Sequence, residues 1–150
     1  MNKLVLNTGK WSAIICLAAF VVWIISFIGI AVSSPLFYWT NLEAYINYVN
    51  NNSQFFQYLA KSFMIVFSFV FMILYIVFYE FTSADKKIFA KISIAFIVMF
   101  SLVSSVHYFI QISAVRFAFN EQEFEGLQHF LQAKPTSFIA SVNMLGWTFF

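Results

Sequence analysis

The sequence predicts an all-α fold, a multi-pass transmembrane helical bundle, and three observations support it. The 150 residues are 62% hydrophobic and only 9% charged, whereas about 25% of a soluble domain is charged. The mean hydropathy is +0.83. Three uncharged apolar segments are each long enough to cross a hydrocarbon core of about 30 Å. So few charges could not cover the surface of a water-soluble monomer of this size.

The three complete spans are predicted at residues 11–32, 62–79 and 92–115. The first span could instead be a cleaved signal peptide. Its apolar run, however, exceeds the roughly 7 to 15 residues of a signal peptide's hydrophobic region. A fourth apolar segment, 138–150, covers only about 20 Å at 1.5 Å per residue. We therefore expect one membrane-embedded domain over 1–150 that is the N-terminal part of a longer protein. The alternative is a fourth helix that enters only one leaflet.

The basic residues predict the orientation, because loops rich in Lys and Arg stay in the cytoplasm. Five lie at one end of the predicted spans and three at the other. The two groups are Lys3, Lys10, Lys86, Lys87 and Lys91, and then Lys61, Arg116 and Lys134. The larger group predicts a cytoplasmic N-terminus.

Each of the two outer loops is expected to contain a short amphipathic helix on the membrane surface. In the first loop, Thr40 and Glu43 have the spacing of a capping box, and apolar residues follow at helical intervals. In the second loop, Asn120 and Glu123 have the same spacing, and Pro135 ends the segment.

A polar stripe runs along the third span and is the main functional signal of the sequence. At 100° per residue its members share one face of about 120°. They are Ser101, Ser104, His107, Tyr108 and Gln111. Because lipid cannot solvate such a face cheaply, we expect it to face other helices or a wet cavity.

Depth along the helices suggests which polar groups could meet in the outer half of the bundle. Gln111 lies about 6 Å and His107 about 12 Å below the outer end of the third span, and Asn143 about 8 Å below the start of the fourth. Arg116 would lie at the outer entrance to this group of polar side chains. The candidate cluster, for ligand binding or for interhelical hydrogen bonds, is therefore His107, Gln111, Tyr108, Asn143 and Arg116.

Two functional hypotheses follow. The first is a non-enzymatic membrane protein for assembly, sensing or transport, in which the stripe packs helices or binds a small ligand. The alternative is a membrane-embedded enzyme that acts on a lipophilic substrate, with His107 as its acid or base. No acidic residue in any span could assist His107, which favours the first hypothesis.

The sequence gives no sign of a metal, a cofactor or a nucleic-acid partner. His107 and His129 have no recognised ligand spacing, so we expect no metal and no cofactor. The net charge of +2 gives no case for nucleic acid. The expected partners are the lipid bilayer and either a small lipophilic ligand or other membrane subunits. No motif of a known family is matched residue by residue.

Overall fold

The computed structural model describes residues 2–150, and within them it contains helices and no strand. Helix makes up 79% of the chain, which confirms the all-α prediction. Three stretches are long and apolar enough to cross a membrane, namely Lys3–Ser33, Phe55–Phe81 and Ala84–Glu121. The predicted spans lie within these three stretches, and each helix continues beyond them by several residues.

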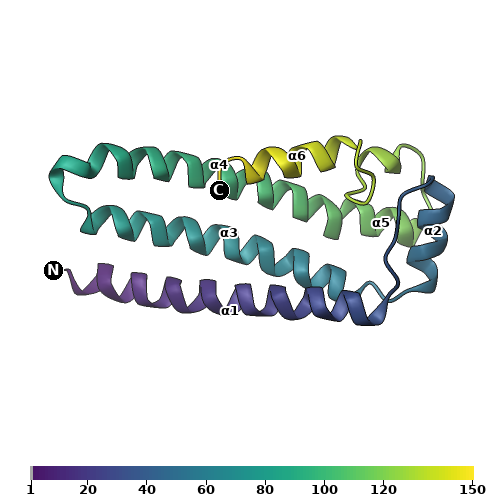
Figure 1. Cartoon of the computed structure of the whole chain (residues 1–150), viewed down its shortest axis with the longest axis horizontal. Helices are drawn as coiled ribbons and strands as arrows, with labels where there is room; N and C mark the ends of the chain where they lie inside the picture. Colours follow the sequence, from purple (N-terminus) through teal and green to yellow (C-terminus); the bar gives the residue numbers. More distant parts are fainter. Residues whose placement is uncertain (1) are drawn as a thin grey trace.

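The long helices lie side by side in the order in which the chain makes them. Helix α1 (Lys3–Ser33) packs along α3 (Phe55–Phe81), and α3 packs along α4 (Lys87–Ile112). Figure 1 shows α3 between the other two, with the N-terminus and the α3–α4 turn at the same end of the molecule. The two groups of basic residues therefore lie at opposite ends of the bundle.

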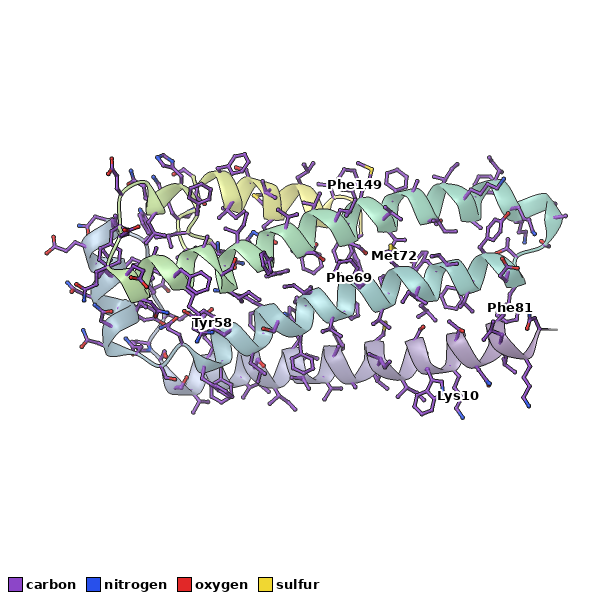
Figure 2. The ribbon with its side chains drawn as sticks, turned by 180° about the vertical axis from the view of Figure 1, so that it is seen from behind. Lys10, Tyr58, Phe69, Met72, Phe81 and Phe149 are labelled. Carbon is purple, nitrogen blue, oxygen red and sulfur yellow. The ribbon has the colours of Figure 1, made fainter. Side chains whose placement is uncertain are left out.

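Helix α1 buries mainly small side chains. The buried residues of α1 are Ser12, Cys16, Ala19 and Ser26. Most of its large apolar side chains are instead exposed, and Figure 2 shows side chains projecting from both long edges of the bundle. Such a distribution suits a bundle surrounded by lipid, where small residues let helices approach closely.

The first outer loop contains the expected helix, α2 (Leu42–Asn51). Its cap is Asn41, one residue after the predicted Thr40, and the Asn41 side chain accepts a hydrogen bond of 2.8 Å from the Ala44 N–H. Asn suits this position because its short side chain reaches the free amide groups of the first turn. Figure 1 shows α2 across the end of the bundle opposite to the N-terminus.

The second outer loop differs from the prediction. Helix α5 (Ala114–Glu121) continues α4 after an irregular residue, Ser113, and ends at Glu121, where we expected the loop helix to begin. Gln122 has a left-handed backbone with a φ of 59°. Turns and one short 3-10 helix, Leu127–His129, follow. The amphipathic helix predicted from the apolar spacing does not form here. Leu127 instead packs in a cluster with Val115 and Leu131.

The fourth apolar segment forms a helix of ten residues, α6 (Phe138–Trp147), rather than one that extends to residue 150. Ser137 caps it, since its hydroxyl accepts from the Ala140 N–H at 3.0 Å. Helix α6 packs against α4, and Figure 1 shows the C-terminus about halfway along the bundle. The chain after α5 therefore folds back over the half of α4 that lies farther from the N-terminus.

Candidate functional site

The polar stripe of α4 is buried, as the helical spacing predicted. His107 is 0% exposed and Gln111 is 1% exposed. The other members, Ser101, Ser104 and Tyr108, are between 1% and 7% exposed. Helix α4 thus turns its polar face towards α3, α6 and the second outer loop.

The inner part of the stripe joins α4 to α3. The Ser101 hydroxyl donates to the backbone carbonyl of Ser68 at 2.7 Å. The hydroxyls of Ser68 and Ser105 are 3.1 Å apart and share a second hydrogen bond. Small hydroxyl side chains satisfy each other here while they allow close helix contact, so this part of the stripe packs helices.

His107 joins α4 to the beginning of α6. Its Nδ1 lies 3.1 Å from the backbone carbonyl of Ile139, which requires the tautomer with a proton on Nδ1 if the bond forms. Its ring also packs edge-on against Tyr108, with the ring centres 4.7 Å apart. The second ring nitrogen, Nε2, is buried without a hydrogen-bond partner in the part of the chain that the structure describes.

Gln111 fastens the second outer loop to α4. Its amide nitrogen donates to the backbone carbonyl of Phe130, and its amide oxygen accepts from the Gln132 N–H at 3.3 Å. One side chain thus satisfies two backbone groups of a loop that has no regular secondary structure at this point. Buried backbone groups need such partners, so Gln111 determines where the loop lies.

Within residues 2–150, Asn143 and Arg116 make no hydrogen bond to the other predicted members of this cluster. The Asn143 amide oxygen on α6 is buried and has no hydrogen-bond partner among residues 2–150, and so it does not pair with His107. Arg116 is exposed, and its guanidinium lies over the Tyr58 ring at 5.5 Å. Arg116 therefore joins α5 to α3 at the end of the bundle, where Figure 2 labels Tyr58.

A cleft of about 380 Å³ opens beside the stripe at the same end of the bundle. Helices α1, α3 and α4 form its walls, and α2 and both outer loops contribute to its rim. Its polar lining includes Tyr45, Tyr48, Gln57, Lys61, Tyr108, Gln111 and Gln132. Its apolar lining includes Trp23, Phe27, Ile30, Leu36, Phe37 and Ala60.

The sequence prediction missed several polar groups of this cleft, among them Gln57, Lys61 and Gln132. Lys61 was counted only as a basic residue at the outer ends of the spans, and Gln57 and Gln132 were not considered. Gln57 and Lys61 are four residues apart and so lie on one face of α3. This spacing could have identified them, but Gln132 reaches the cleft only because Gln111 holds the loop there.

Tyr45 supplies a hydroxyl group that stays protonated over a wide pH range. Burial, together with charge repulsion from the neighbouring phenols of Tyr58 and Tyr48, raises the pKa of Tyr45 to about 12. Its ring packs against Phe37 at 5.2 Å and against Phe119 at 6.1 Å. The α2 helix is thus attached to both outer loops through one aromatic side chain.

Three acidic residues line a different hollow. Glu121, Glu123 and Glu125 are exposed around this second hollow, in the second outer loop. Within residues 2–150 no group of three or more His, Cys, Asp or Glu side chains could hold a metal ion. None of the residues that line the first cleft is acidic.

Comparisons with protein-family models, with curated proteins and with solved structures give no match for this chain. Any functional conclusion therefore depends on the residues and geometry described above.

Proposed function

We propose that this chain is a multi-pass integral membrane protein without enzymatic activity, which binds a small lipophilic ligand in the cleft between α1, α3 and α4. A role in sensing, transport or assembly follows from such binding. The observation that carries the proposal is the cleft itself, whose polar groups gather beside apolar walls. Ligand sites are commonly clefts of about 300–1,000 Å³ with mainly apolar walls and a few converging polar groups.

The proposed topology has the N-terminus and the α3–α4 turn in the cytoplasm, because five of the eight Lys and Arg residues lie at that end. Helix α2 would then lie at the outer membrane surface. Its polar and apolar residues alternate with helical spacing, which suits an interfacial position. Helix α6 would enter only the outer half of the bilayer, since ten residues rise about 15 Å.

A second candidate is the membrane-embedded enzyme with His107 as acid or base. The unpaired Nε2 atom favours it, because a buried nitrogen without a partner is available for proton transfer. Against it, His107 is fully buried and is not among the residues that line the cleft. A substrate in the cleft would therefore not touch the imidazole, and ligand binding is the better supported function.

Native mass spectrometry of the detergent-purified protein tests the proposal. We expect the wild type to retain a small lipophilic molecule after purification from the membrane. Ala31→Trp places a large ring at the rim of the cleft and should abolish binding of this molecule. Ala18→Trp adds the same ring to an exposed position of α1 and should leave it bound.

The proposal would be contradicted if the wild type bound nothing when incubated with a total lipid extract, or if Ala31→Trp bound as much as Ala18→Trp. His107→Gln separates the two candidates. It should leave the bound mass unchanged under the binding hypothesis, whereas a substrate converted to product in the wild type but not in this variant would favour the enzyme.

A further inference from the structure

The cleft contains one cationic side chain and no anionic one. Lys61 lines it from α3, and no acidic residue is present among its lining residues. The hydrogen bonds and ion pairs within residues 2–150 leave Lys61 without a partner. An ammonium group next to apolar walls is costly to keep unpaired, so a negatively charged group from outside the chain would be stabilised there.

The polar groups around Lys61 are mostly hydrogen-bond donors. The carboxamide groups of Gln57 and Gln132 also line the cleft, and the Gln132 side chain lies beside the His107 ring. Tyr45 adds a hydroxyl whose pKa of about 12 keeps it protonated at physiological pH. Charge-assisted hydrogen bonds from an ammonium, amides and a phenol suit the oxygen atoms of a carboxylate or phosphate.

The apolar wall extends from this polar end towards the middle of the bundle. Lys61 lies about 9 Å from the start of α3, whereas Trp23 lies about 15 Å from the end of α1 at the same end of the molecule. The rings of Trp23 and Phe27 pack edge to face with their centres 4.7 Å apart. Phe27 is 53% exposed, so this wall continues onto the outer face of α1.

We infer that the ligand of this cleft is an amphiphile with an anionic headgroup. Its headgroup pairs with Lys61 and accepts hydrogen bonds from the surrounding donors, and its hydrocarbon chain lies along Trp23 and Phe27 towards the bilayer interior. This inference rests on the proposed function, because it identifies the chemical class of the ligand at the same site. A fatty acid and a lipid phosphate share this chemistry, and the experiment distinguishes them.

Equilibrium binding of three single-chain probes to the purified protein in an uncharged detergent tests the inference. The probes are hexadecanoate, hexadecyl phosphate and hexadecanol, which differ only in the headgroup. We expect at least one of the two anions to bind the wild type about tenfold more tightly than the alcohol. The anion that binds more tightly shows whether the site prefers a carboxylate or a phosphate.

Three variants show whether Lys61 is responsible. Lys61→Gln removes the charge and should bring the anions to within about twofold of the alcohol, while Lys61→Arg should keep most of the difference. Lys134→Gln removes the same charge at the same end of the bundle but outside the cleft, and should behave as wild type. Binding of the alcohol to Lys61→Gln shows that this variant is folded.

The outcomes separate this inference from the proposed function. If the wild type binds the alcohol as tightly as both anions, or if Lys61→Gln keeps the preference for anions, the inference is wrong although the cleft still binds ligands. If none of the three probes binds the wild type, both the inference and the proposed function are wrong.

Discussion

The buried Gln111 side chain and the buried amide oxygen of Asn143 have opposite surroundings. Gln111 donates to the Phe130 carbonyl and accepts from the Gln132 N–H, whereas the Asn143 amide oxygen has no partner in residues 2–150. A buried polar group without a partner lowers stability, while one with partners supports the segment that it holds. The two residues should therefore respond differently to the same substitution.

We expect Gln111→Leu to lower the free energy of unfolding by about 1–3 kcal/mol, because it leaves two backbone groups of the loop unpaired. The matched variant, Asn143→Leu, removes an unpaired oxygen and should be neutral or stabilising. Thermal unfolding in detergent measures both, and hydrogen exchange should rise in residues 130–137 of the first variant only. Equal destabilisation by both variants would contradict this assignment.

Tyr45 should make stability depend on pH at the alkaline end. Its pKa is about 12 in the folded protein and about 10 in the unfolded chain. Between these values the folded state keeps a proton that the unfolded state releases, so stability falls as pH rises, by about 3 kcal/mol at most.

Chemical unfolding between pH 8 and 11.5 tests this expectation. Tyr45→Phe should lose less stability than the wild type over this range, because it removes the group that titrates. The prediction fails if both proteins lose stability in parallel above pH 10.

At the level of the elements, hydroxyl side chains set the distance between α3 and α4. Ser101 is 1% exposed and bonds directly to the backbone of α3 at Ser68, whose own side chain is 0% exposed. A larger side chain at this point would have to separate the two helices. The stability of the α3–α4 contact therefore depends on the volume of the side chain at position 101 as well as on its hydrogen bond.

Ser101→Leu should lower the melting temperature by several degrees, since overpacking costs about 1–3 kcal/mol. Ala95→Leu places the same side chain on an exposed face of α4 and should have little effect. Thermal unfolding of the two variants in the same detergent makes the comparison. Similar melting temperatures would mean that the α3–α4 contact is looser than the structure indicates.

The sequence predicted burial well where the pattern of a single helix was enough to show which face must be buried. The spacing of Ser101, Ser104 and Gln111 predicted a buried face, because a polar face within an apolar helix has few alternatives. It was less informative for the second outer loop, where turns replace the helix expected after Asn120. There the contacts of Leu127 and Leu131 with distant residues outweigh the local helical spacing.

The cleft could not be predicted for a related reason. Its lining comes from five separate segments, and their relative placement depends on how the helices and loops pack. Asn143 was placed near His107 from depth alone. It shares one face of α6 with Ile139 and Gly146, which contact α4 at His107, Val103 and Ser104. Within residues 2–150, however, its amide oxygen has no hydrogen-bond partner, and depth alone could not show this.

At the scale of the whole molecule, the two ends of the bundle should differ in accessibility across the membrane. We expect a cysteine at position 50, in α2, to react with an impermeant maleimide in intact cells. A cysteine at position 83, beside the α3–α4 turn, should react only after permeabilisation. Both variants use a Cys16→Ala background. The reverse pattern would invert the proposed topology.

The order of packing has a consequence for how the protein is made. Helix α1 packs along α3, α3 along α4, and α4 along α6, so each long contact joins elements that are consecutive or nearly consecutive in synthesis. Each helix can thus find its neighbour as it leaves the ribosome, without waiting for a distant partner. Low sequence separation of contacts favours rapid folding. We expect the α1–α3 hairpin to form first and to provide the surface on which the later helices assemble.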